Sequence, residues 1–264
     1  MKRFFLVLPV TILVLSILIY KGFLDDFFIN EYHRFDQFKN YQTKKKCPSD
    51  FSILNYCLSN TYAKPKQLFI GDSSILAVAG SLDTNTPTLF IGGGSCPLID
   101  GIIASFSEPG CELKSKLFMD RFDSDYFSEL ESVYIMHRSE YLLQLNTNVY
   151  IGLMEDFIDK LLERKISVNI VLEPKSLSNN PERCISRRMF ESTFECFTYY
   201  PEVYDKRFQI LNESNLTTQY KVITTKINSD FRIETYKDSV HITASSIPCY
   251  YSEFNKISNS ICLE

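Results

Sequence analysis

The sequence predicts an α/β fold in which a parallel β-sheet is covered by helices on both faces. Short apolar runs of strand length recur along the chain and end at glycine or polar residues, as buried parallel strands do. They alternate with a segment of helical periodicity, and this alternation is typical of βαβ units. An apolar stretch at the N-terminus is the third observation, and it predicts a membrane anchor ahead of the domain.

Five apolar runs account for the predicted strands. In chain order they are QLFIG (67–71), PTLFIGGG (87–94), SVYIMH (132–137), ISVNIVLE (166–173) and YKVITTKI (220–227). The segment VYIGLMEDFIDKLLERK (149–165) is expected to be a helix, because its apolar residues recur at helical spacing. A closing helix is expected within 242–257, where Pro248 interrupts the pattern.

The N-terminal segment predicts a single-pass membrane protein. Lys2 and Arg3 precede an uncharged stretch from Phe4 to Tyr20, at the short end of the about 17–25 residues that span a bilayer. The two cations favour a cytoplasmic N-terminus, which sends the rest of the chain outward. A cleaved signal peptide is the alternative, but no A-x-A-like site follows the apolar run.

A single-pass membrane protein with this sequence is predicted to have three parts. Residues 1–21 form an anchor in the inner or cytoplasmic membrane, residues 22–46 form an aromatic and charged juxtamembrane stalk, and residues 47–264 form one domain. The domain is expected in the periplasm or outside the cell.

The eight cysteines agree with export, because they fall into neighbouring pairs that each close a short loop. The pairs are Cys47/Cys57, Cys96/Cys111, Cys184/Cys196 and Cys249/Cys262. Zinc is the alternative, but no C-x-x-C motif occurs and the three histidines are scattered. We therefore predict disulfides between neighbours, and no metal or other cofactor.

Composition and charge exclude two further classes. Hydrophobic residues make up 45% of the chain, enough for a core, so a disordered chain is excluded. The formal net charge is −4, and the longest run of cations is Lys44–Lys46. Because phosphate binding needs a concentrated basic surface, no nucleic-acid partner is expected.

The segment QLFIGDSSILAVAG (67–80) sets polar residues between a predicted strand and a predicted helix. Gly71 permits a sharp turn, and Ser73 then lies near the helix N-terminus, where free backbone N–H groups point outward. A serine hydroxyl is a weak nucleophile that needs a general base. Helix capping is the alternative role, because aspartate and serine are both preferred at N-caps.

The segment YKDSVHIT (236–243) supplies a candidate base. Asp238 and His241 are three residues apart, a spacing that lets the carboxylate hold the imidazole in one tautomer. His241 would accept the Ser73 proton, and Asp238 would stabilise the imidazolium. A surface turn with an incidental histidine is the alternative. The positions of the two segments, at opposite ends of one α/β domain, favour the catalytic interpretation.

With these segments the chain resembles the SGNH/GDSL hydrolases, in which FIGDSS and YKDSVHIT correspond to the first and last blocks. It is more similar to the SGNH domains associated with membrane-bound acyltransferases that O-acetylate bacterial surface glycans. Those domains also carry a glycine-rich turn that runs into Cys-Pro, as in GGGSCPLIDG (92–101), and an arginine after the third strand, as in YIMHRSEY (134–141). The resemblance covers about residues 66–258. It implies a three-layer, flavodoxin-like α/β sandwich with Ser73, Asp238 and His241 as the triad.

The resemblance also implies an oxyanion hole, which a glycine and an asparagine complete in the wider family. Gly93 or Gly94 corresponds to the glycine. No asparagine occurs in 132–141, so Arg138 is the expected second donor, as the closer family suggests. The alternatives are a plain turn for the glycines and a surface salt bridge for Arg138.

What the resemblance implies for function is serine-based acyl-ester chemistry outside the membrane. Ser73 would take an acyl group, expected to be acetyl, and pass it to a glycan hydroxyl, as an O-acetyltransferase, or to water, as an acetylesterase. The partners are an acylated glycan or carbohydrate acceptor and a multi-span membrane protein that donates the acyl group. The non-enzymatic alternative is a degenerate domain that binds glycan or scaffolds an envelope complex, and the missing asparagine supports it.

Overall fold

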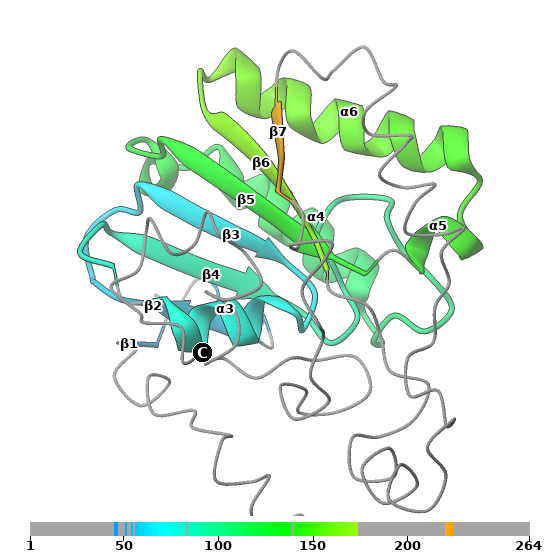
Figure 1. Cartoon of the computed structure of the whole chain (residues 1–264), viewed down its shortest axis with the longest axis horizontal. Helices are drawn as coiled ribbons and strands as arrows, with labels where there is room; N and C mark the ends of the chain where they lie inside the picture. The colour runs from blue at the N-terminus through cyan, green and yellow to red at the C-terminus, as the bar shows by residue number, and fades with distance from the viewer. Residues whose placement is uncertain are drawn as a thin grey trace, which may run out of the picture.

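One β-sheet organises the part of the chain that the computed structural model describes. The described residues are 45–46, 51, 54, 56–82, 84–138, 140–173 and 220–223. Among them, seven strands form a sheet in the order β1-β2-β4-β3-β5-β6-β7 (Figure 1). The strands are β1 (Lys45–Lys46), β2 (Tyr56–Ser59), β3 (Gln67–Gly71), β4 (Thr88–Gly92), β5 (Ser132–His137), β6 (Ser167–Leu172) and β7 (Tyr220–Ile223).

The sheet is parallel through its centre and antiparallel at one edge. Strands β4, β3, β5, β6 and β7 run parallel, whereas β2 pairs antiparallel with β4 and β1 antiparallel with β2. The predicted α/β class is confirmed, but the sheet is mixed rather than wholly parallel. Residues 60–66 are too short a connection for the crossover that a parallel β2 would need, so this strand pairs in the opposite sense.

The helices lie on both faces of the sheet (Figure 1). They are α3 (Ile75–Ser81), α4 (Cys111–Phe122), α5 (Tyr141–Gln144) and α6 (Thr147–Glu163), with a 3-10 turn η3 (Asp125–Phe127). The connection from β3 to β4 runs one way across the sheet, and those from β4 to β5 and from β5 to β6 run the other way. Because such crossovers are right-handed, α3 covers one face and α4 and α6 cover the opposite face.

The central strands are buried on both sides, as their continuous apolar sequences predict. All five residues of β4 are buried, and so are the last four of β3. On one face, Phe118 of α4 and Phe157 of α6 join a core cluster with Ile70 of β3. On the other face, the Phe69 ring stacks on Phe90 and Tyr134, with centroids 5.1 and 4.3 Å away. This packing makes the sheet a rigid platform for the turns at its carboxyl edge.

The predicted disulfide Cys96–Cys111 is present, with a Cα–Cα distance of 5.6 Å. Cys57 is also disulfide-bonded. The other cysteines, the anchor over 1–21 and the closing helix within 242–257 lie outside the described residues. Within the described ranges, no helix is long and apolar enough to cross a bilayer. Strand β1 occupies the last two residues of the predicted stalk, so the sheet begins before Cys47.

Candidate active site

The carboxyl ends of β3, β4 and β5 meet at one edge of the sheet. In the strand register, Gly71 lies opposite Gly92 on one side and Met136 on the other. The chain leaves β3 towards α3 on one face and leaves β5 towards α5 and α6 on the other. The position between β3 and β5 is therefore a topological switch point, where ligands bind in open α/β sheets. Ser73 and Arg138 flank it.

Two glycines bring these strand ends together. A Cβ on Gly71 would lie 1.6 Å from the Met136 carbonyl oxygen, and one on Gly92 would lie 2.7 Å from the Gly71 carbonyl oxygen. Any larger residue would force the strands apart. Both glycines are therefore required by the close approach of neighbouring backbones.

Asp72 ties the turn after β3 to the end of β5. Its carboxylate is fully buried. Oδ1 accepts a hydrogen bond from the Ser74 N–H, and Oδ2 accepts one from the Arg138 N–H, both at 2.9 Å. A buried carboxylate with two backbone donors holds its surroundings in one geometry. Asp72 therefore fixes the positions of Ser73 and Arg138 relative to each other.

The two serines of the turn have different surroundings. Ser73 is partly buried, whereas Ser74 is 8% exposed. Ser74 occupies the N-cap position of α3, but its side chain makes no capping hydrogen bond. The Asp72 carboxylate therefore takes the helix-capping role in this turn, because it accepts the Ser74 N–H. Of the two serines, Ser73 is the more exposed to solvent.

The glycine turn after β4 contains both predicted oxyanion glycines. The Gly93 N–H already donates to the Cys96 carbonyl, 3.2 Å away. Gly94 accepts a hydrogen bond through its carbonyl from the Glu108 N–H at 3.1 Å. Of the two glycines, Gly94 is therefore the better candidate for an oxyanion donor.

Arg138 forms the salt bridge that was its alternative role, and its partner is Glu140. Nη2 and Nε donate to the two Glu140 carboxylate oxygens at 2.8 and 3.3 Å, and Nη1 takes part in neither bond. The guanidinium also lies over the Phe106 ring, 5.3 Å from its centroid. Burial opposes the charged form, but hydrogen bonding to Glu140 and its charge outweigh burial and raise the pKa of Arg138. A fixed positive charge thus lies beside the switch point.

His137 is a core histidine in this structure. Its ring is fully buried and stands edge-on to Tyr141 and Tyr150. Nδ1 lies 3.3 Å from the Arg138 carbonyl oxygen, and Nε2 lies 3.3 Å from the Tyr150 hydroxyl. This setting is that of a histidine packed in the core.

Tyr141 is a buried neighbour of the site that sequence analysis did not single out. Burial raises the pKa of its hydroxyl well above the usual range, and the negative charge of Asp72 raises it further. The phenol therefore remains protonated at neutral pH. The only sequence signal is its place three residues after Arg138.

The structure brings together one part of the predicted site. Ser73, Gly93, Gly94 and Arg138 all lie at the carboxyl edge of the sheet. Asp238 and His241 lie outside the described residues, so the triad remains a prediction. Among the described residues, no group of three or more histidine, cysteine or acidic side chains is arranged to hold a metal ion.

The fold and site define an α/β domain with a serine turn at its switch point. Among solved structures, the chain is similar to the periplasmic domain of a lipopolysaccharide acetyltransferase from Salmonella ser. Paratyphi A. The TM-score is 0.51 and the identity 14%, over 68% of this chain and 78% of that one. No protein-family model matches the sequence, and no curated protein matches it. The predicted resemblance to the domains of glycan acetyltransferases is therefore confirmed at the level of the fold.

Proposed function

We propose that this chain is an extracytoplasmic serine acyl-ester enzyme that acts on O-acetyl groups of a surface glycan. The observation that carries the proposal is the position of Ser73. It follows β3 at the switch point, in a turn fixed by Asp72, and the fold is shared with an acetyltransferase periplasmic domain. The proposed triad is Ser73, Asp238 and His241.

In the proposed mechanism, the Ser73 hydroxyl attacks the carbonyl carbon of an acetyl ester. His241 accepts the serine proton, and Asp238 stabilises the imidazolium. The Ser73 and Gly94 N–H groups and Arg138 stabilise the oxyanion, each donor contributing about 3–4 kcal/mol. Collapse of the intermediate expels the alcohol, which takes the proton from His241, and leaves an acetyl-serine. A glycan hydroxyl or water then attacks the acetyl-serine and gives its proton to His241. Collapse of this second intermediate breaks the bond between the acetyl group and the Ser73 oxygen, and His241 returns the proton to that oxygen.

The supply of acetyl groups follows from the proposed topology. The anchor over 1–21 is too small to move an acetyl group across a bilayer. A separate multi-span membrane protein would therefore deliver the acyl group on the outer side. The proposed acceptor is a surface glycan, because the similar solved domain comes from a lipopolysaccharide acetyltransferase.

The pH dependence of ester hydrolysis tests the general base. His241 must be neutral to accept the Ser73 proton, and an ordinary histidine titrates near ~6.5. The value of kcat/KM for a chromogenic acetyl ester should therefore fall on acidification, along one limb in that range. The measurement is a profile from pH 5 to 8 for the wild type and for Asp238→Asn, which should lose activity at every pH because the tautomer of His241 is disturbed.

His137→Gln is the control for this profile. His137 is buried between Tyr141 and Tyr150 and has no assigned proton transfer, so the acidic limb should stay where it is. A flat wild-type profile, or a limb that disappears in His137→Gln, would contradict the role of His241.

A further inference from the structure

The turn between β4 and α4 has a strained backbone. Ser95 and Leu98 adopt φ values of 50° and 59°, in the left-handed region that side chains with a Cβ rarely occupy. Leu98 is also fully buried. Such conformations persist only where the surrounding structure holds them, and they gather at functional sites.

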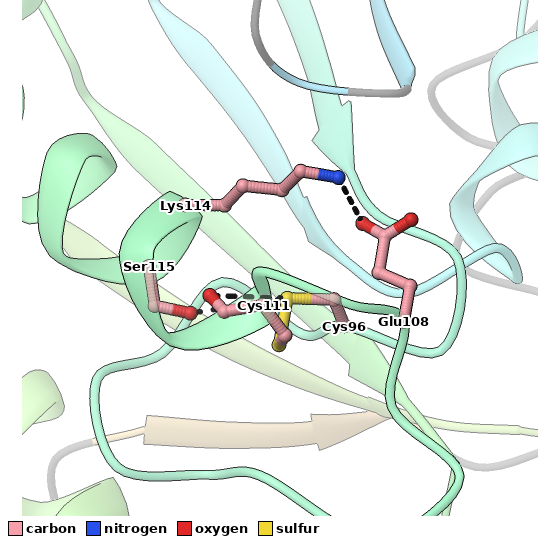
Figure 2. Close-up of polar contacts among 5 residues, drawn as sticks. All are labelled: Cys96, Glu108, Cys111, Lys114 and Ser115. Carbon is pink, nitrogen blue, oxygen red and sulfur yellow. Dashed lines mark hydrogen bonds and ion pairs between the residues drawn. A yellow bond between two sulfur atoms is a disulfide. The ribbon is translucent and has the colours of Figure 1, made fainter.

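Three tethers hold this turn, and Figure 2 shows the disulfide among them. The disulfide joins Cys96 to Cys111, the first residue of α4. Within the turn, the Gly93 N–H donates to the Cys96 carbonyl at 3.2 Å. The Glu108 N–H donates to the Gly94 carbonyl at 3.1 Å, which joins the loop before α4 to the glycine turn. The turn is therefore connected to α4 by a covalent bond and to Glu108 by a hydrogen bond.

The Glu108 carboxylate lies directly against the two glycines. A Cβ on Gly93 would lie 2.5 Å from Oε1, and a Cβ on Gly94 would lie 3.0 Å from Oε2. Neither glycine has a positive φ, so the backbone conformation does not call for glycine there. A Cβ would instead press on the Glu108 carboxylate, and one on Gly93 would also lie 2.7 Å from the Cys96 Cβ. The Glu108 side chain is only 13% exposed. A negative charge with little access to water therefore lies on this turn.

Lys114 neutralises that charge. It extends from α4, and its Nζ lies 2.8 Å from Glu108 Oε1, with its own side chain 17% exposed (Figure 2). Lys116, two residues on, makes a similar pair with Glu112 at 2.7 Å, but those side chains are 55% and 64% exposed. Water screens the second pair more than the first, so the charge of Lys114 acts on its carboxylate more strongly than that of Lys116 does.

We propose that Glu108 and Lys114 are positioning residues for the oxyanion-stabilising turn. Glu108 holds Gly94 in place, and Lys114 cancels the carboxylate charge that would otherwise oppose the negative oxyanion. The inference rests on the proposed function, in which the Gly94 N–H faces the oxyanion. Since the oxyanion exists only in the transition state, the charge of Lys114 should affect kcat rather than KM.

Lys114→Met tests the inference, because it removes the positive charge and keeps the carboxylate on the turn. For a chromogenic acetyl ester, kcat should fall at least about tenfold while KM stays within about twofold; losing a whole oxyanion donor costs about 10²–10³-fold. Lys114→Arg should keep most of the activity. Each kcat is divided by the fraction of molecules that a fluorophosphonate titrates to completion, so misfolded protein does not enter the comparison.

The double variant tests the charge directly. Glu108→Gln combined with Lys114→Met removes both charges and should regain most of the lost kcat per titrated site, because no carboxylate charge then opposes the oxyanion. Lys116→Met is the matched control and should match the wild type. A Lys114→Met kcat within twofold of wild type, or no recovery in the double variant, would overturn the inference alone. A wild type that neither hydrolyses the ester nor reacts with the fluorophosphonate would overturn the proposed function and the inference with it.

Discussion

Replacing Ser73 with alanine is expected to abolish hydrolysis of a chromogenic acetyl ester, by about 10⁴-fold or more. The acyl group is transferred to the Ser73 hydroxyl in the proposed mechanism, and alanine has no oxygen to accept it. The fold should remain intact, because the Asp72 carboxylate and the Ser74 N–H still form the turn. Steady-state kinetics and circular dichroism of the two proteins make the measurement.

Ser74→Ala is the matched control for this prediction. Ser74 is buried at the start of α3, and its side chain makes no capping hydrogen bond, so its removal should change activity only a few fold. Equal losses at Ser73 and Ser74, or retained activity in Ser73→Ala, would contradict the assignment of the nucleophile.

Replacing Asp72 with alanine is expected to cost about 3–5 kcal/mol of the free energy of unfolding. The change leaves the Ser74 and Arg138 N–H groups without their acceptor, and each buried unpaired group costs about 1–3 kcal/mol. In a domain of this size the melting temperature should fall by roughly 10 °C. Thermal unfolding followed by circular dichroism measures the shift.

Asp125→Ala serves as the comparison for Asp72. Asp125 also bonds a donor, Lys64 at 2.6 Å, but its side chain is 84% exposed, so water replaces the lost contact and the melting temperature should hardly move. Asp72→Asn keeps one acceptor oxygen and should fall between wild type and Asp72→Ala. An Asp72→Ala protein that melts within 2 °C of Asp125→Ala, at about the wild-type value, would contradict the structural role of the carboxylate.

The strands at the centre of the sheet were predictable because they are buried on both faces. Their sequences are continuous apolar runs, and β3, β4, β5 and β6 were all predicted from them. Helix α6 was predicted from its spacing, and the structure buries five apolar residues at that spacing: Tyr150, Met154, Phe157, Ile158 and Leu161. Strand β2, YCLS, was not predicted because a strand of four residues has too few apolar positions to show a period.

Helix α4 shows why periodicity fails where the buried face is chemically mixed. Its buried residues, Cys111, Ser115, Phe118 and Phe122, follow helical spacing. Two of these four are cysteine and serine, small residues that contribute little to an apolar periodicity. The disulfide and the hydrogen bonds around the turn help to hold α4 in place where its apolar surface is small. A hydropathy pattern shows neither kind of bond.

The candidate site was predictable wherever it follows a strand end, and not where contacts join distant segments. The turns at Gly71, Gly94 and Arg138 each follow a predicted strand, and parallel strands end together at one edge of a sheet. The bond from Arg138 to Asp72 spans 66 positions in the chain, and the contact of Glu108 with the glycine turn depends on how the loop before α4 folds. No local pattern encodes either contact.

The most direct test of the central claim is to react the full-length chain with a fluorophosphonate and map the modified peptide by mass spectrometry. Fluorophosphonates react with serines that a base has activated, so we predict one adduct in the wild type, on Ser73. Ser73→Ala and His241→Ala should give none, and Ser74→Ala should still be labelled. An unlabelled wild type, or an adduct on any other serine, would contradict the account.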